Sequence, residues 1–424
     1  METHEFPRAL ALGLGRGILH LRDHDGHPYR ELILDACLHN RAYDPQVEGS
    51  RAAYMLEVIR ESREMAFFTG AVLRSLFDTG HDWDTPQRFE LARRLAQSGN
   101  TEAREAMYAA FKAAELSASD VAVEFIELDG INGLLFVVGQ IGRQLTANAS
   151  RWEDDFLVEE ASRLCGEEPV DAALQDAAKT NADVRAFLDG VKEVRALRTA
   201  SQRPNAEGLT YDQIRSLIES GKAGGIVVRW AEMASDSDLQ AAGHDLVQER
   251  DPKRLISYLH MFRKRPFPLE ITALLNLVEL PDGPIPRHAL RALANLQDDS
   301  VRHLAFKLIE TSSSERGYSI DLLVNNFRDG DHRIVETWCD AETDPDTVNA
   351  FSRSLPALFA AHPDADTEKR LLRSLYEREP CAHCRCSIVE CLIQLNALTE
   401  DMRRECVYDS YADTRSLMKV GATS

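Results

Sequence analysis

The feature that most constrains this fold is a short helical signature that recurs along the chain. Each copy has an acidic or amide residue that is followed, a few residues later, by an arginine. The arginine begins a segment in which apolar residues recur at helical spacing. The arginines are Arg104, Arg185, Arg302 and Arg415, and they are separated by 81, 117 and 113 residues. These distances are close to two, three and three steps of roughly 40 residues. Such a repeat is typical of stacked helical hairpins, each of which buries its apolar face against its neighbours.

The spacing of apolar residues predicts helices along nearly the whole chain. The clearest hairpin spans residues 85–114, where Thr85-Pro86 is a typical helix start and Gly99-Asn100 separates two amphipathic stripes. Further helix starts are predicted at Asp44-Pro45, Thr210-Tyr-Asp-Gln213, Asp251-Pro252 and Asp344-Pro345. Residues 224–228 are the one strand-like segment, and five residues cannot make a sheet. The sequence therefore predicts an all-α fold, an α-solenoid of stacked antiparallel hairpins.

One stretch without an apolar stripe divides the chain. Arg198 to Gly208 is polar and contains proline and glycine, so it is predicted to be a linker or long loop. On this basis residues 1–197 form an N-terminal helical-repeat half, and residues 209–424 form a C-terminal half. Each half has room for about five hairpins at the inferred period.

Charge and hydropathy narrow the classes of function. The formal net charge is −20, which repels nucleic acid and anionic membranes at long range. The N-terminal charge order does not fit an export signal, and the apolar run 131–141 is shorter than the ~20 residues that span a bilayer. Eight cysteines are too sparse for a disulfide scaffold. We expect an acidic cytoplasmic protein with no cofactor and no membrane partner.

The proline-started helix, tight turn and second helix opening Asp-x-x-Val-Arg resemble the HEAT-repeat superfamily. Asp298-Asp-Ser-Val-Arg302-His-Leu-Ala305 matches the pattern best, and Asn181-Ala-Asp-Val-Arg185-Ala-Phe-Leu188 follows. The resemblance implies a curved α-solenoid with a scaffolding role, in which the acid and the arginine bridge adjacent hairpins. It implies no reaction, because function is added to such folds site by site.

A basic island interrupts the acidic background. Between residues 250 and 265 six basic residues accompany a single acid, Asp251, and two further arginines extend the island if successive hairpins stack in register. The candidate partner-binding residues are Arg250, Lys253, Arg254, Arg263, Lys264, Arg265, Arg287 and Arg291, with Arg302 as a possible continuation. Such a stripe suits phosphates or an acidic partner. The competing interpretation is that Arg263-Lys-Arg265 complements the negative end of a helix stopped by Pro266.

Two clusters have metal-ligand chemistry. Cys381, His383, Cys384 and the distant Cys406 could assemble a four-ligand zinc site. The competing interpretation places Cys384 and Cys391 on an apolar helix face, as small core residues. The turn Asp23-His-Asp-Gly-His27 also offers two carboxylates and two imidazoles, without a third element that points to a metal.

The glycine patterns indicate packing and not nucleotide binding. Gly13-x-Gly15-x-Gly17 does not follow a strand, as the dinucleotide fingerprint requires. The helical run 131–145 contains glycines at 133, 139 and 142, with another at 130, which predicts tight helix–helix contact.

Three functional hypotheses follow. The first is a non-enzymatic scaffold that binds a protein or peptide on its concave face, with no catalytic residues. The alternative is a nucleic-acid-binding HEAT-like protein, such as a DNA glycosylase-like enzyme, that uses the basic island 250–302. The third is a metal-dependent hydrolase that uses the 23–27 turn or the C-terminal cysteines.

Overall fold

The computed structural model describes residues 5–78, 83–113, 119–148, 151–200, 206–281, 283–311, 315–364 and 369–420. Within these ranges the chain forms helices joined by turns and contains no strand, which confirms the all-α prediction. The strand-like segment 224–228 instead begins helix α15 (Ile226–Met233). Its buried residues Val227, Trp230 and Ala231 recur at helical spacing, which a five-residue window is too short to reveal.

The chain divides into two compact units. Unit 1 comprises Met1–Gln202, Cys381–His383 and Thr399–Ser424, and unit 2 comprises Arg203–Pro380 and Cys384–Leu398. Of the predicted linker 198–208, the first three residues end helix α13 (Ala182–Ala200), and residues 201–205 lie outside the described part of the chain. Contacts therefore group residues 399–424 with the N-terminal helices, although they are remote in sequence.

Most of unit 1 is a series of helices in chain order, closed by two helices from the far end of the sequence. They are α1 (Phe6–Leu12), α2 (Arg16–Asp23), η2 (His27–Tyr29), α3 (Arg30–Leu38), α4 (Pro45–Glu48), α5 (Ala52–Glu61), α6 (Met65–Ser75), α7 (Asp84–Gln97), α8 (Thr101–Ala113), α9 (Ser119–Asp129), α10 (Ile131–Ala147), α11 (Phe156–Cys165), α12 (Glu167–Thr180), α13, α26 (Glu400–Cys406) and α27 (Ala412–Val420). The described residues of the predicted hairpin 85–114 form α7 and α8, which pack together. Helix α7 begins at Asp84 and has no side-chain N-cap, so the predicted cap at Thr85 is wrong.

Two hydrophobic cores run through unit 1. One is built from α1 to α3 and α5 to α8, and the other from α6 to α13. Helix α10 crosses α9 and α13 closely, because two of its glycines face backbone. A Cβ atom on Gly133 would lie 1.9 Å from the carbonyl oxygen of Phe125, and one on Gly142 would lie 1.8 Å from that of Asp183. The prediction of close helix contact at these glycines is confirmed.

The C-terminal helices of unit 1 dock on its first two helices. The Ser410 amide donates to the Gly13 carbonyl (2.8 Å), and Arg16 makes a bidentate pair with Glu405 (2.7 and 2.8 Å). A Cβ atom on Gly15 would lie 2.0 Å from the Glu405 carbonyl oxygen. Gly13 also has a left-handed φ of +69° at the end of α1. The missing side chains at Gly13 and Gly15 thus make room for the C-terminal segment of the chain, and this packing explains the glycine pattern without a nucleotide.

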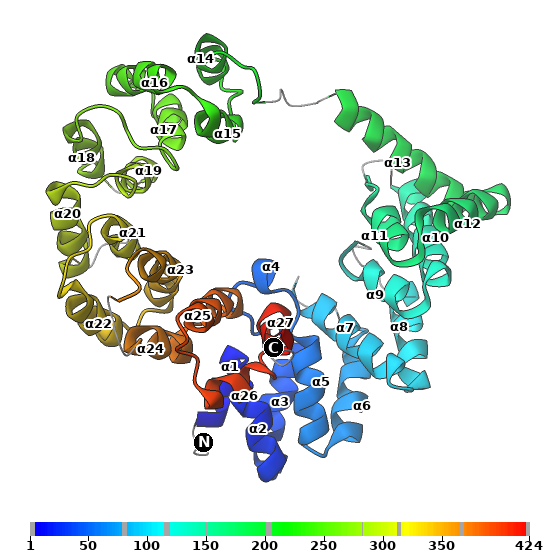
Figure 1. Cartoon of the computed structure of the whole chain (residues 1–424). Helices are drawn as coiled ribbons and strands as arrows, with labels where there is room; N and C mark the ends of the chain where they lie inside the picture. Colours follow the sequence, from blue (N-terminus) through cyan, green and yellow to red (C-terminus); the bar gives the residue numbers. More distant parts are fainter. Residues whose placement is uncertain are drawn as a thin grey trace. The chain divides into compact units, whose positions relative to one another are not determined.

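In unit 2 the helices lie in two rows (Figure 1). One row contains α16 (Asp236–Gln248), α18 (Thr272–Val278), α20 (Asp299–Glu310), α22 (Asp331–Ala341) and α24 (Arg370–Arg378). The other row contains α15, α17 (Pro252–Met261), α19 (Pro284–Leu293), α21 (Ser319–Val324, preceded by η3, Arg316–Tyr318) and α23 (Pro345–Ala361). Within this second row each helix packs on the next. Helix α14 (Tyr211–Glu219) precedes both rows, and α25 (Ala382–Gln394) follows them.

The predicted helix starts are confirmed in unit 2. The Asp251 carboxylate accepts the amides of Lys253 and Arg254, the Asp344 carboxylate accepts that of Thr347, and Thr210 forms a capping box with Gln213. Successive helices of the second row begin 26 to 35 residues apart. This spacing is shorter than the expected period of roughly 40.

The best-matching signature arginine connects successive helices of one row. Arg302 on α20 forms an ion pair with Asp331 at the start of α22 (2.6 Å), and its guanidinium lies 4.5 Å from the centroid of the Phe306 ring. The Asp298 carboxylate caps α20 by accepting the Ser300 amide. The acid that pairs with Arg302 therefore comes from the following helix of the row and not from its own signature.

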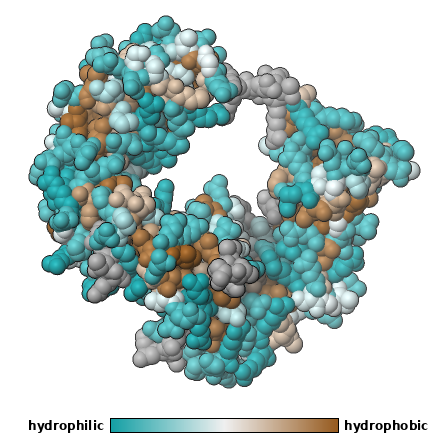
Figure 2. Space-filling model, viewed as in Figure 1, coloured by the Kyte–Doolittle hydropathy of each residue, from teal (hydrophilic) through white to brown (hydrophobic). Residues whose placement is uncertain are grey.

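Hydrophilic residues dominate the face of the molecule shown in Figure 2, and hydrophobic residues show in bands between them. The apolar stripes of these helices are largely covered by their neighbours, as expected for helices packed in layers. Among the described residues, no helix is both long and apolar enough to cross a membrane.

Candidate functional site: an arginine pocket in unit 2

Four arginines of unit 2 line a pocket along the second helix row. The pocket has a volume of about 560 Å³ and takes its lining from the end of α17 and from α19, η3, α21 and α23. Four of its lining side chains are arginines, Arg263, Arg287, Arg291 and Arg353, and we call it the arginine pocket. A second pocket of about 440 Å³ shares Arg287, Arg291 and Tyr318 with it.

Helix geometry explains why α19 contributes two of the four arginines. Arg287 and Arg291 are four residues apart, so they lie on the same helix face. The other faces of α19 are buried through Pro286, Ala289, Leu290, Ala292 and Leu293. Packing of these apolar residues fixes the rotation of α19, and it thereby directs both guanidinium groups to the pocket.

Aromatic and acidic neighbours hold the α19 arginines in place. The guanidinium of Arg291 lies 5.6 Å from the centroid of the Tyr318 ring and 3.4 Å from its hydroxyl oxygen. Arg287 Nε lies 3.4 Å from a carboxylate oxygen of Glu315, which is buried. The Arg287 side chain is still 48% exposed, so it remains accessible to a ligand.

The lining of the pocket contains a single acid beside its four arginines. Asp321, on α21, has its pKa raised by burial, although Ser354, Arg353 and Arg291 act in the opposite direction. A carboxyl group with a raised pKa carries less negative charge near its titration range. With four arginines and one acid, the lining has a clear cationic excess, whereas the side-chain amides of Asn295 and Asn325 already donate to backbone carbonyls.

Two histidines beside the pocket report its positive potential. His260 Nε2 and His288 Nε2 lie 3.4 Å apart, and the two rings meet edge to face. The pKa of His288 is lowered to about 4, first by burial and then by the charges of His260, Arg291 and Arg263. The pKa of His260 is lowered by the same causes, burial first and then Arg263 and Arg291. Both imidazoles thus favour the neutral form near pH 7.

Because the pKa values of both histidines are lowered, we expect the folded protein to lose stability in mild acid. The folded-state pKa of His288 lies below the ordinary histidine value of 6.5. Its contribution is therefore present above pH 6.5 and is lost as the pH falls toward 4, since the unfolded chain binds the proton more tightly. We expect the protein to lose about 1 kcal/mol through His288 between pH 7 and pH 5, allowing for its partial exposure. Urea unfolding of the wild type and of His288→Gln at both pH values measures this difference. The matched control is His303→Gln on the exposed face of α20, and equal pH dependence in all three proteins would contradict the expectation.

The structure brings together only part of the predicted basic island. Arg263, Arg287 and Arg291 line the arginine pocket, whereas the other five predicted residues do not. Lys253 and Arg254 are exposed at the start of α17. The Arg250 guanidinium donates to the carbonyls of Val247 and Glu249, at the end of α16.

The two remaining predicted residues, Lys264 and Arg265, contact the C-terminal end of α15. Lys264 forms an ion pair with Glu232 (2.5 Å). Arg265 donates to the carbonyls of Ala231, Glu232 and Ala234 and pairs with Asp236 (3.0 Å). Arg265 therefore caps the C-terminal end of α15. The helix-end interpretation is correct for this residue, but the helix is not α17, which precedes Arg265 in the sequence.

Sequence reasoning missed several residues of the pocket. Arg353 lies 62 residues after Arg291, on α23, and no charge run marks it. Tyr318, Asp321 and Ser354 were also absent from the predicted set, as were the two histidines. Only the order of helices in the row could have connected these positions, because each helix contributes one or two side chains.

The C-terminal cysteines are buried. Cys384, Ile388, Cys391 and Leu392 of α25 are all buried, which confirms the core interpretation of this helix face. Ligand atoms of Glu379, Cys381 and Cys384 lie within 4.8 Å of one another, all within six consecutive residues of the chain. His383 Nδ1 instead lies 3.0 Å from the Tyr411 hydroxyl oxygen. Three ligands are fewer than the four of a structural zinc site.

The side chains of the Asp23-to-His27 turn are used in local contacts. Asp25 accepts the amide of His27, whose ring lies 3.3 Å from Glu64. His24 Nδ1 lies 3.0 Å from the His20 carbonyl oxygen, and the two rings stack at 4.0 Å. These contacts do not converge on a common point, so the turn offers no set of metal ligands.

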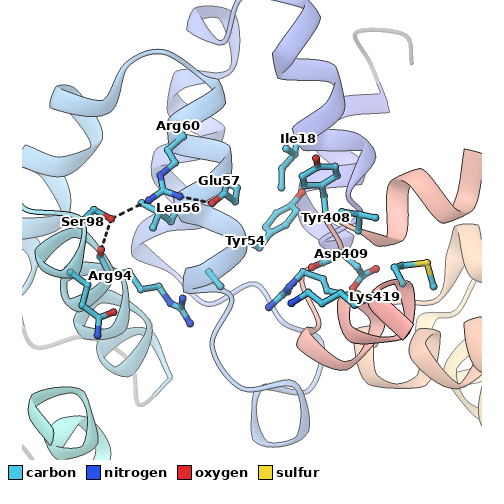
Figure 3. Close-up of a pocket in the computed structure, with 15 residues that line it drawn as sticks. Ile18, Tyr54, Leu56, Glu57, Arg60, Arg94, Ser98, Tyr408, Asp409 and Lys419 are labelled. Carbon is cyan, nitrogen blue, oxygen red and sulfur yellow. Dashed lines mark hydrogen bonds and ion pairs between the residues drawn. The ribbon is translucent and has the colours of Figure 1, made fainter. Parts of the chain in front are cut away.

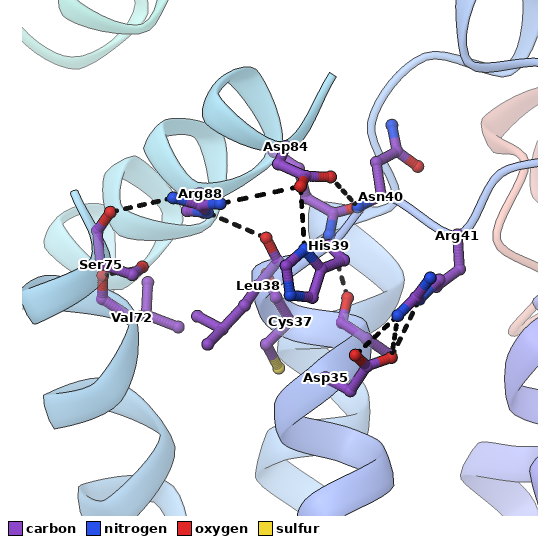
Figure 4. Close-up of polar contacts among 12 residues, drawn as sticks. Asp35, Cys37, Leu38, His39, Asn40, Arg41, Val72, Ser75, Asp84 and Arg88 are labelled. Carbon is purple, nitrogen blue, oxygen red and sulfur yellow. Dashed lines mark hydrogen bonds and ion pairs between the residues drawn. The ribbon is translucent and has the colours of Figure 1, made fainter. Parts of the chain in front are cut away.

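Unit 1 also contains a histidine–aspartate pair, shown in Figure 4. His39 Nδ1 lies 2.8 Å from Asp84, whose other carboxylate oxygen accepts the amide of Asn40. The buried Arg88 donates to the carbonyls of Leu38 and Ser75. The cluster thus connects the end of α3 to α6 and to the start of α7. We interpret it as a structural network, since its bonds satisfy the backbone at helix ends.

Comparison with known proteins gave no relative. No family model matches the chain, and neither a curated protein nor a solved structure matches it.

Proposed function

We propose that the protein is a helical-repeat scaffold that binds an acidic segment of a protein partner at the arginine pocket of unit 2. In this proposal unit 2 is an α-solenoid similar to HEAT repeats, and the second helix row forms its binding face. The protein acts in the cytoplasm and catalyses no reaction itself. The observation that carries the proposal is the convergence on one pocket of four arginines from three helices of the second row: Arg263 at the end of α17, Arg287 and Arg291 on α19, and Arg353 on α23.

The chemistry of the pocket favours a short anionic segment. Guanidinium groups bind carboxylates through paired, charge-assisted hydrogen bonds. The pocket of about 560 Å³ receives a few side chains and not the length of a duplex. The net charge of −20 also repels a long polyanion, whereas a short acidic segment experiences mainly the local arginines. Both arguments favour a protein partner over nucleic acid.

A binding experiment with model ligands tests this proposal. The probe is a fluorescein-labelled peptide rich in aspartate and glutamate, measured by anisotropy against the full-length protein at low and physiological salt. We expect saturable binding that weakens with salt, because the contacts are ionic. Arg287→Glu and Arg291→Glu should each weaken binding by about tenfold or more.

The matched control is Arg254→Glu, which reverses an exposed charge of the same basic island outside the pocket. It should leave the affinity within about twofold. Equal losses for the control and the pocket variants would reject the pocket as the site. Stronger binding of duplex DNA than of the acidic peptide at low salt would replace the proposal by the nucleic-acid alternative.

A further inference from the structure

Unit 1 contains a pocket of its own, and the residues that line it are remote in sequence from the basic island. It has a volume of about 700 Å³ and lies where α5, α7 and α27 face one another (Figure 3). This volume is within the range of about 300–1,000 Å³ that is usual for small-molecule sites. The C-terminal segment supplies one wall, so the pocket exists only when α26 and α27 are docked.

Cationic groups from three helices line this pocket. They are Arg60 on α5, Arg94 on α7, and Arg415 and Lys419 on α27, against the two acids Glu57 and Asp409. Figure 3 shows Arg60 and Arg94 on one side and Lys419 on the other. Glu57 is paired with Arg60 (2.6 Å), and the Asp409 carboxylate accepts the amide of Tyr411. Both acids are therefore engaged, and the lining has an excess of positive charge.

Arg94 and Arg415 place like charges near each other from two different helices. The pKa of Arg415 is lowered, first by burial and also by the charge of Arg94. Arg415 is held there by the carbonyls of Asp409 and Ser410 (2.6 and 2.8 Å). Arg94 is paired with Glu90 of its own helix (2.7 Å), and both guanidinium groups line the pocket, so an anionic group bound between them would accept hydrogen bonds from both.

The rest of the lining is mainly apolar. Ile18, Tyr54, Leu56 and Met418 are each less than 8% exposed, and Val407 is an exposed hydrophobic residue at 44%. When a ligand covers an apolar side chain that is exposed beside a cavity, the free energy of the complex is lowered, because apolar surface is removed from water. Charged and apolar groups thus occupy the same cavity, as in sites for molecules that combine a polar head with a hydrophobic body.

We infer that this pocket binds a small organic anion, a carboxylate or phosphate head joined to an apolar body, with the head between Arg94 and Arg415. The body of the ligand would lie against Leu56, Val407 and Met418. Since the ligand would contact both α7 and α27, its binding would hold the C-terminal helices against unit 1. This site is independent of the proposed partner binding in unit 2.

Calorimetric titration of the full-length protein tests the inference with four probes. Octanoate and octyl phosphate carry the head and the body, 1-octanol carries the body alone, and acetate carries the head alone. We expect one saturable site for octanoate or octyl phosphate, with 1-octanol and acetate weaker by about tenfold or more. The tighter of the two anions identifies the head group. Binding should also raise the thermal midpoint, because ligand stabilises the folded state.

Arg94→Gln is the informative variant, because Arg94 is partly exposed and does not hold α27. It should weaken octanoate binding by about tenfold. Arg104→Gln, a paired arginine of α8 outside the pocket, should leave it unchanged. The inference is wrong if neither anion binds, if 1-octanol binds as tightly as octanoate, or if Arg94→Gln and Arg104→Gln behave alike.

Discussion

Replacing Gly142 by alanine is expected to destabilise unit 1 by about 3 kcal/mol or more, because the new methyl group has no room. Its Cβ atom would lie 1.8 Å from the Asp183 carbonyl oxygen and 2.6 Å from the carbonyl carbon. Both atoms belong to the backbone of α13, so no side-chain rotation relieves the clash. Helices α10 and α13 would have to separate, and core residues such as Val184 and Phe187 would lose their packing.

The same helix supplies a matched control. A Cβ atom on Gly139 would meet only the Asn181 side-chain amide, at 3.8 Å. Gly139→Ala should therefore be neutral or stabilise by up to about 1 kcal/mol, since alanine favours the helix more than glycine. Gly133→Ala should resemble Gly142→Ala, because its Cβ atom would lie 1.9 Å from the Phe125 carbonyl oxygen. Urea unfolding followed by circular dichroism measures all three variants. Similar stability of the Gly142 and Gly139 variants would show that α10 and α13 are not packed as described.

Replacing Arg93 by methionine should cost about 3–5 kcal/mol, because it leaves carboxylates without their partner. Arg93 on α7 is 6% exposed and bonds Glu124 (2.5 Å) and Glu127 (2.9 Å) on α9, with Glu90 at 3.6 Å. Methionine keeps much of the side-chain volume, so the loss reports mainly the charge. As a control, Arg104→Met removes a half-exposed arginine that pairs with Asp129 (3.0 Å), and it should cost less than about 1 kcal/mol.

The loss in the Arg93 variant should depend on pH. The pKa of Glu124 is already raised to about 7, since burial and the neighbouring Glu90 and Glu127 outweigh the effect of Arg93. A carboxyl group with a raised folded-state pKa stabilises the folded protein fully at pH values below its unfolded pKa of about 4.5. This stabilisation is lost as the pH rises through 7. Without Arg93 the pKa rises further. The variant should therefore recover about 1–2 kcal/mol of its loss between pH 8 and pH 5. Denaturant unfolding at both pH values measures this recovery, and an unchanged loss would mean that Glu124 is not the group left unpaired.

Local chemistry made the helices predictable from the sequence. Asp251, Asp344 and Thr210 cap helices because their side chains reach backbone amides two or three residues away. Glycines at helical spacing in residues 131–145 predicted close contact, and Gly133 and Gly142 make it. These signals lie within one turn or one helix face, so a single sequence contains them.

Long-range assembly was less predictable. The sequence predicts a basic stripe from residues 250–265 that later arginines extend if hairpins stack in register. In the structure Arg265 caps α15, Arg302 pairs with Asp331, and Arg353 enters the pocket from α23. Which face a helix presents depends on the packing of its apolar residues against neighbours that the sequence alone does not identify. The grouping of residues 399–420 with the first helices had no local signal, apart from Gly13 and Gly15. Pairing of distant segments is the information that one sequence does not carry.

The docking of α26 and α27 on α1 and α2 has a consequence for synthesis. Residues 399–420 leave the ribosome after all of unit 2, so unit 1 waits through some 200 residues of translation before its last helices arrive. During that time Gly13, Gly15 and Arg16 remain uncovered. A nascent or prematurely terminated chain therefore exposes a surface that the finished chain hides, and chaperones or proteases can distinguish the two by it.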